Sequence, residues 1–345
     1  MTRDFTIDLS PGEGREFMHL ILTGRNGSGK TFILDRIADY ADERRGAAWL
    51  VGLECKSSDI KVRWTDAPLA TSQSPILPTI ISLPARRQVL FETVRGPAPD
   101  TDLTAAAQLE QVLVNLRTQV ALARGDADEV AATEPDGQIR AYESILRDLL
   151  NEPGLRLVFD RRQISYFIEL GGQPLEFNHL PDGFRSAIRI WAEIRSTIRK
   201  SGQDRGIVLI DEVEGHLHLE LQARLLPFLT RTFPRMQFIA ATHSPAVISS
   251  IDGAVVYDLS THTRVLSDDL RGVRYGALMT SHFGIAADFD LASLEELREL
   301  ERLHTKQDRS DTEEARLREL ADRLSRRSHS LALLVRNAGM VTAAA

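Results

Sequence analysis

The chain has 345 residues, 43% hydrophobic and 26% charged, a composition typical of a globular protein and not of a disordered or fibrous one. Its single cysteine, Cys55, excludes an internal disulfide framework and a zinc site built from cysteines. The formal net charge of −7 excludes a uniformly basic nucleic-acid-binding surface, and no apolar run approaches the ~18 residues of a membrane span. Segment 1–10 lacks the apolar core of a signal peptide, so we expect a cytoplasmic protein without a membrane partner.

The N-terminal part of the chain reads as strands around one helix. Two short β-prone runs, at 5–10 and 16–24, are separated by proline and glycine, and we expect them to form a hairpin or to pair. Apolar residues at helical spacing over 32–45 predict a helix directly after the second run. Further strands are expected at 47–57 and 79–89, separated by a polar stretch that contains proline.

The segment 97–152 has a different character and predicts a helical hairpin inserted into an α/β domain. An acidic, loop-like break at 125–137 separates two helical faces. The apolar residues of the two faces are Leu109, Val112, Leu113, Leu116 and Val120 in the first and Ile139, Tyr142, Ile145, Leu146 and Leu149 in the second.

Strands and helices alternate again after this insertion. The continuous apolar run 206–210 is typical of a buried parallel strand. We expect further strands at 155–160, 164–170, 236–242 and 254–259. Helices are expected at 184–200 and 217–229. Beyond about residue 265 the chain reads as mainly helical, and two leucine stripes indicate helices that pack on each other or on the body of the protein. The stripes are Leu291, Leu294, Leu297, Leu300 and Leu303, then Leu317, Leu320 and Leu324.

The segment 24–31 matches the phosphate-binding pattern G-x-x-x-x-G-K-[ST] in full, after an apolar strand and before a helix. Glycines let successive backbone N–H groups turn toward phosphates, and the start of the following helix adds positive character. Lys30 supplies a charge for the β- and γ-phosphates, and Thr31 offers a hydroxyl to Mg²⁺. The predicted ATP-binding residues are Gly24, Arg25, Asn26, Gly27, Ser28, Gly29, Lys30 and Thr31.

Two carboxylates, Asp211 and Glu212, follow the apolar run, at the end of a strand where open α/β sheets bind ligands. Asp211 suits the coordination shell of Mg²⁺, and Glu212 suits a general base that orients water toward the γ-phosphate. The competing interpretation is that both cap the next helix. A third polar residue, His243, directly follows the predicted strand 236–242. We predict that it contacts the γ-phosphate. A lone histidine in such a place is otherwise structural.

Together these motifs resemble the ABC-type ATPases, and among them the SMC/RecF/OLD-like branch, in particular the bacterial anti-phage defence ATPases of the Septu and retron-associated (PtuA-like) kind. The run 211–218 is similar to their D-E-P-E-x-H-L-H motif, with Val213 in place of the proline. The resemblance covers residues 1–260. It implies an ABC-type head at 1–260 that contains the helical insertion 97–152, followed by a mainly helical region at 261–345.

The resemblance also implies that two heads bind ATP and Mg²⁺ between them in a homodimer. The second head would contribute a signature loop, for which Pro181, Asp182 and Gly183 are the candidates. The family usually has serine where Pro181 stands, and proline has neither a hydroxyl nor a backbone N–H, so we expect slow hydrolysis. For the glutamine that contacts Mg²⁺ in this family, Gln88 and Gln163 are both candidates. For His216 and His218, the family match favours interface or structural roles over a metal site.

Three functions stay open on the sequence. The first is an ATPase that regulates a partner effector, a nuclease of the HNH or a similar kind, in anti-phage defence. The second is a RecF-like ATPase of DNA repair or chromosome maintenance that binds DNA itself, with the arginines of 85–89 and 160–164 as a local basic surface or as ordinary solvated side chains. The third is a nucleotide-gated scaffold with little hydrolysis. Whether the chain binds nucleic acid therefore stays open on the sequence.

Overall fold

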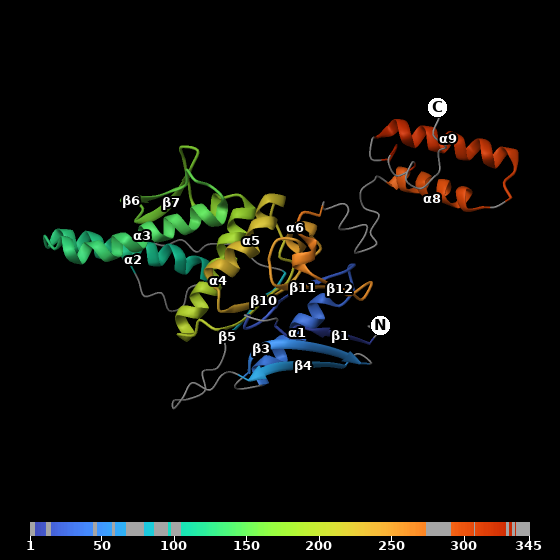
Figure 1. Cartoon of the computed structure of the whole chain (residues 1–345). Helices are drawn as coiled ribbons and strands as arrows, with labels where there is room; N and C mark the ends of the chain where they lie inside the picture. The colour runs from blue at the N-terminus through green and yellow to red at the C-terminus, as the bar shows by residue number, and fades with distance from the viewer. Residues whose placement is uncertain are drawn as a thin grey trace. The chain divides into compact units, whose positions relative to one another are not determined.

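Figure 1 shows the computed structural model, which describes residues 4–11, 15–43, 47–56, 59–66, 79–85, 96–97, 105–273, 291–306, 308–328, 331–332 and 335. The chain divides into two compact units, Met1–Val273 and Arg274–Ala345. The motifs predicted to bind nucleotide all belong to the first unit, and each unit is described by itself.

The central sheet of the first unit has six strands in the order β12-β11-β2-β10-β9-β5. They are β2 (His19–Thr23), β5 (Thr79–Leu83), β9 (Gly206–Ile210), β10 (Met236–Ala241), β11 (Ala254–Asp258) and β12 (Thr263–Leu266). All run parallel except the edge strand β12. Every residue of β9, β10 and β11 is buried, because helices or a second sheet cover both faces. The predicted α/β class is confirmed.

A second, antiparallel sheet has the order β1-β3-β4, with β1 (Phe5–Asp8), β3 (Ala47–Lys56) and β4 (Asp59–Asp66). The predicted pairing of the first two strands is wrong, because β1 pairs with β3 in the register Phe5↔Cys55. The burial patterns explain the separation. The alternating pattern of β1 suits a sheet with one solvated face, whereas the apolar run of β2 suits a central strand. The sequence pattern did not predict β4.

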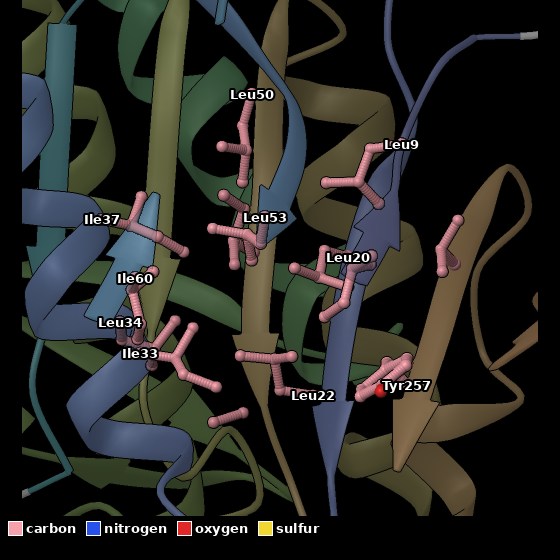
Figure 2. Close-up of a cluster of buried hydrophobic side chains, with 14 of the residues drawn as sticks. Leu9, Leu20, Leu22, Ile33, Leu34, Ile37, Leu50, Leu53, Ile60 and Tyr257 are labelled. Carbon is pink, nitrogen blue, oxygen red and sulfur yellow. The ribbon is translucent and has the colours of Figure 1, made fainter. Parts of the chain in front are cut away.

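The core between the two sheets also contains α1 (Lys30–Glu43), whose Ile33, Leu34 and Ile37 are buried in it (Figure 2). One buried polar side chain joins the sheets. The Gln237 amide nitrogen donates to the Met18 and Leu50 carbonyls at 2.7 and 2.8 Å, and its oxygen accepts from the Leu50 N–H at 2.8 Å. Because every polar atom of this side chain has a partner, its burial is not penalised.

Helices α4 (Asp182–Ser201), α5 (Leu219–Thr232) and α6 (Pro245–Ile248) lie on the side of the central sheet opposite to α1 in Figure 1. Trp191 and other apolar residues of α4 are completely buried. The amphipathic spacing of α4 and α5 thus places their apolar stripes on the core, as the sequence predicted.

The inserted segment forms the predicted helical hairpin, α2 (Ala105–Gly125) and α3 (Glu129–Leu150). The expected acidic break is much shorter than 125–137, because the Asp128 carboxylate accepts from the Ala131 N–H at 2.9 Å and starts α3 early. Pro135 therefore lies inside the helix. The hairpin packs on α4 and on a small antiparallel sheet of β6 (Arg156–Asp160), β7 (Ser165–Leu170) and β8 (Gln173–Leu175).

Two short 3₁₀ segments complete the first unit, at Phe177–His179 and Ser267–Leu270. The second unit contains α8 (Leu291–Thr305) and α9 (Asp311–Arg327). The prediction that its leucine stripes pack together is confirmed, since Leu300 and Leu303 share a core with Leu317, Leu320 and Leu324. The side chains of Leu291 and Leu294 lie outside the described residues. Among the helices that the structure describes, none combines the length and apolar character of a membrane span.

Glu110 of α2 is a buried acid that should make stability depend on pH. Burial raises the pKa of its carboxyl to about 7, although the carboxylate accepts a hydrogen bond from the Tyr166 backbone. Folding therefore favours the protonated form, and the free energy of unfolding should fall as the pH rises from about 4.5 to about 7 and level off above that. Glu110→Gln should be more stable than the wild type at pH 8 by up to about 3 kcal/mol, and close to it near pH 4.

Denaturant unfolding at both pH values tests this expectation. Glu129→Gln, at an exposed position at the start of α3, is the matched control and should change stability little at either pH. A Glu110→Gln chain that is no more stable than the wild type at pH 8 would show that this carboxyl is not a significant linkage site.

Candidate functional site

The predicted phosphate-binding loop connects β2 to α1 at the carboxyl edge of the central sheet. Gly24, Gly27 and Gly29 all have positive φ, of 132°, 77° and 99°. At Gly24 glycine is needed twice over, because a β-carbon there would also lie 3.0 Å from the hydroxyls of Ser28 and Ser260. Arg25, Asn26 and Gly27 are exposed, whereas the Ser28 hydroxyl is buried without a hydrogen-bond partner among the described residues. The loop thus leaves donor groups available for a ligand.

Lys30, the first residue of α1, is buried with its ammonium group inside the loop. Its Nζ donates to the Gly24 and Arg25 carbonyls at 3.0 and 3.3 Å. Burial lowers the pKa of Lys30, and the nearby carboxylates of Glu212 and Asp211 oppose that shift. The first N–H groups of α1 have no acceptor within the helix. An anion placed in the loop would meet a preorganised set of donors and a cation.

Thr31 and Asp211 lie side by side although 180 residues separate them. The Thr31 hydroxyl donates to Asp211 Oδ2 at 2.8 Å. Hydroxyl and carboxylate oxygens are the ligands that Mg²⁺ prefers, and Mg²⁺ typically takes few of them from the protein and the rest from water and phosphate. In the part of the chain that the structure describes, no group of three or more His, Cys, Asp or Glu side chains is placed to hold a metal ion. The pair therefore fits a nucleotide-bound Mg²⁺.

Glu212 and His243 face each other from the ends of neighbouring strands. His243 Nε2 lies 3.7 Å from Glu212 Oε1, and both side chains are partly exposed. Glu212 adopts a left-handed backbone with φ of 49°, which non-glycine residues rarely adopt and which is common at functional sites. The structure thus brings both predicted catalytic residues together, within reach of the same space above the sheet.

A further carboxylate, Glu214, joins the loop after β9 to the loop after β10. Its Oε2 accepts from the Thr242 hydroxyl at 2.7 Å, and its Oε1 accepts from the His243 backbone N–H. Thr242 in turn accepts from the Ser244 N–H at 3.0 Å. Glu214 therefore sets the backbone position of His243 relative to Glu212. The sequence placed Glu214 only within the family motif and indicated no such role.

The loop after β11 supports the phosphate-binding loop, which the sequence did not indicate. The Ser260 hydroxyl accepts from the Arg25 N–H at 2.7 Å. Asp258, buried at the end of β11, holds this loop by accepting from the Ser260 and Thr261 N–H groups at 2.6 and 3.2 Å. The sequence feature that could have indicated this supporting role is the position of Asp258 at the end of another parallel strand.

The predicted signature residues lie at the start of α4. Pro181 is the N-cap and makes no side-chain capping bond, and the exposed Asp182 is paired with Arg185, whose guanidinium lowers the pKa of that carboxyl. A β-carbon on Gly183 would lie 3.0 Å from the His216 carbonyl oxygen. The first turn of α4 therefore packs directly on the loop that follows Glu214, and a glycine is required for that approach.

The two motif histidines differ in their surroundings. His218 is the N-cap of α5, and its Nδ1 accepts from the Leu221 N–H at 3.3 Å. His216 is exposed, has a φ of 66° and faces α4 through its carbonyl oxygen. The positions give His218 a structural role and place His216 on the outer surface of the loop.

The structure separates the two glutamine candidates. Gln163 is exposed in the turn between β6 and β7, where its backbone N–H donates to the Asp160 carboxylate at 3.2 Å. Arg161 and Arg162 are exposed in the same turn. Gln88 lies outside the described residues. The chain leads to it from Leu83, however, whose carbonyl accepts from the Asp211 N–H at 2.9 Å.

Comparison with known protein families agrees with this geometry. Residues 84–249 match the family described as "AAA domain, putative AbiEii toxin, Type IV TA system". The match covers just under half of the chain and includes Asp211, Glu212 and His243. This part of the chain therefore resembles an AAA-type P-loop ATPase domain. The phosphate-binding loop precedes the matched residues, and the parallel sheet places it beside them.

Known relatives of this ATPase domain occur in two bacterial systems. "Septu protein PtuA" of Bacillus mycoides (strain KBAB4) is 30% identical over 155 residues, which are 42% of this chain and 21% of that protein. "Retron Ec83 probable ATPase" of Escherichia coli is 32% identical over 113 residues, 30% of this chain and 21% of that protein. The predicted resemblance to Septu and retron-associated ATPases is confirmed. This chain spans about a fifth of the length of these relatives.

Among solved structures, the "SmcHead bound to the C-winged helix domain of ScpA" aligns with 74% of this chain and 92% of that chain. The identity is 14% and the TM-score is 0.35, so this likeness supports no inference about the chain.

Loss of the support from the β11 loop should weaken nucleotide binding. Ser260→Ala removes the acceptor of the Arg25 N–H and leaves the first turn of the phosphate-binding loop less ordered. The dissociation constant for ATP should rise about threefold to tenfold. Calorimetric titration measures it, with Thr261→Val as the control, because that hydroxyl bonds only Thr263 in the same loop. Equal effects of the two changes would argue against a specific role for Ser260.

Glu214→Gln should separate hydrolysis from binding. The amide offers one acceptor oxygen where two donors, the Thr242 hydroxyl and the His243 N–H, need one each. We expect the ATPase rate to fall about tenfold or more while the affinity for ATP changes less than about twofold. Steady-state turnover and ATP titration check this, with the exposed Glu220→Gln on α5 as the control. Loss of ATP affinity in step with the rate would mean that Glu214 supports the binding loop instead.

Proposed function

We propose that this chain binds and hydrolyses ATP, closes head to head with a second copy around the nucleotide, and regulates an effector in bacterial anti-phage defence. The observation that carries the ATPase part is the juxtaposition of Thr31 and Asp211 at 2.8 Å beside the facing Glu212 and His243. The likeness to Septu and retron-associated ATPases supports the defence part.

Each residue of the site has a task in the proposed reaction. Lys30 and the N–H groups of the loop bind the β- and γ-phosphates, and Thr31 and Asp211 hold Mg²⁺. Bound Mg²⁺ would neutralise charge on the phosphate oxygens. Glu212 orients a water and accepts its proton, and His243 donates a hydrogen bond toward the γ-phosphate. Gln88 is proposed as the glutamine that contacts the metal, on the family resemblance alone.

The dimer part rests on the position of Pro181, Asp182 and Gly183. Gly183 packs against His216 and Leu217 of its own chain, so the start of α4 forms a surface with the loop after Glu214 instead of covering the phosphate-binding loop. We infer that these residues meet the γ-phosphate of a second copy. We propose that the effector is a separate nuclease subunit, on the family resemblance alone. We also propose that the protein acts in the cytoplasm.

A second candidate function, a nucleotide-gated scaffold, is favoured by Pro181. This N-cap makes no side-chain capping bond and has no N–H, so the start of α4 offers fewer donors to phosphate than a serine would provide. In that case ATP would close the dimer while hydrolysis is almost absent. DNA-binding ATPase function of the RecF kind has no comparable support from a described contact.

Substitution of Glu212 and Lys30 tests the reaction. Glu212→Gln should bind ATP normally and lower its hydrolysis about a hundredfold or more, because the general base is lost. Lys30→Ala should abolish measurable ATP binding. The exposed Glu134→Gln on α3 is the control for loss of a carboxylate. A wild-type rate equal to that of Glu212→Gln would favour the scaffold, and unchanged ATP affinity in Lys30→Ala would refute the assigned site.

The assembly is measured on the same Glu212→Gln chain, co-expressed with its neighbouring genes, as a native mass with ATP and Mg²⁺. A dimer with an added nuclease-sized subunit is the expected result. A bare dimer would contradict the effector, and a monomer would contradict binding of ATP between two heads.

A further inference from the structure

A second concave site lies at the opposite edge of the central sheet from the ATP-binding residues. Residues that immediately precede or begin four parallel strands line it: His19 at β2, Arg205 before β9, Arg235 before β10 and Gly253 before β11. Its volume is about 550 Å³, within the usual range of small-molecule sites. Arg15 and Phe17 complete the wall on the N-terminal side.

Three arginines line this basin, and each is paired with an exposed acid, while Arg15 also donates to the Met18 sulfur at 3.7 Å. Arg205 lies 3.7 Å from Glu16, Arg235 lies 2.7 Å from Asp204, and Arg15 lies 3.6 Å from Asp268. Surface ion pairs of this kind contribute little stability, so a ligand that pairs better can replace them at small cost. Moreover, Arg205 Nε is buried without a hydrogen-bond partner among the described residues.

The remaining wall contains two acids, Glu16 and Asp252, beside a neutral and partly aromatic part. Burial lowers the pKa of His19 to about 4, with a further contribution from Arg15, so the ring is neutral at physiological pH. Its Nδ1 accepts from the Phe238 N–H at 3.0 Å, so Nε2 carries the proton and is a donor. The Phe17 ring is anchored between His19 and Trp49, with centroids 5.3 and 4.4 Å away.

Arg15 lies over Gly253 in this wall, where a β-carbon would come within 2.3 Å of Arg15 Nη1. Gly253 also has a φ of 67°, a conformation that favours glycine. The Arg15 side chain is partly exposed and pairs with Asp268 at 3.6 Å, so it belongs to the rim of the basin.

We propose that this basin binds a compact phosphate-bearing ligand of nucleotide size. Planar guanidinium groups match phosphate oxygens in pairs, and the Phe17 and His19 rings offer a surface for a flat heterocycle. The acids Glu16 and Asp252 in the wall, with Asp204 and Asp268 beside it, disfavour an extended polyanion that would run past all four, whereas a compact anion can pair with the arginines and meet fewer of the acids. The inference does not depend on the proposed ATPase function.

Binding of AMP and pyrophosphate to the full chain tests the proposal. The experiment uses a Lys30→Ala chain as the background, so that binding at the phosphate-binding loop does not contribute. The measured quantity is the affinity for AMP and for pyrophosphate, compared with and without the basin arginines. We expect saturable binding of one AMP per chain, weakened about tenfold or more by Arg205→Gln and by Arg235→Gln. Arg140→Gln, which changes an exposed arginine paired with Asp136 on α3, is the matched control and should bind like the background.

A short oligothymidylate provides the opposing outcome. If it binds through Arg205 and Arg235 while AMP does not, the basin is a nucleic-acid surface and the compact-ligand proposal is overturned. Absence of binding by AMP and pyrophosphate at millimolar concentration, or binding that neither arginine change weakens, would also overturn it. Failure here would leave the ATPase proposal intact, since that is judged by Lys30 and Glu212.

Discussion

The parallel register of five strands is the constraint on which the site depends. Leu83 pairs with Ile210, Ile210 with Ala240, Ala241 with Leu22, and Thr23 with Asp258, so five strands end at one level. Backbone bonds past the strand ends hold the loops in the same order. Chemistry scattered from residue 24 to residue 260 thereby converges on one edge, where parallel strands direct their following loops.

The loop from Glu212 to Leu217 connects two parts of this edge. On one side Glu214 holds the backbone of His243, and on the other the His216 carbonyl meets Gly183 of α4. A displacement of His243 would therefore reach the start of α4 through one short, hydrogen-bonded segment. This is a physical route by which a change at the carboxyl edge of the sheet can alter the surface at the start of α4.

The two edges of the same sheet differ in charge. At the carboxyl edge the carboxylates of Asp211, Glu212, Glu214 and Asp258 surround Lys30, which suits a cation-bound nucleotide. At the amino edge Arg15, Arg205 and Arg235 line a basin together with Glu16, Asp252, a neutral histidine and an aromatic ring. The chain as a whole is acidic, so this cluster is a local feature that net charge conceals.

The sequence by itself determined the motifs and the class of fold. The glycine loop, the apolar run before Asp211 and the strand before His243 carry their local signals within a few residues, because backbone freedom and buried strands need particular residue types there. The leucine stripes of α8 and α9 likewise predicted helices that pack on each other or on the body, and the structure shows the first arrangement. Only the tertiary structure decided which strands pair. It separated β1 from β2, added β4, and extended α3 through Pro135 once Asp128 capped it. It also recruited Glu214, Asp258 and Ser260 to the site, because hydrogen bonds between distant loops follow from strand order, which no local pattern encodes.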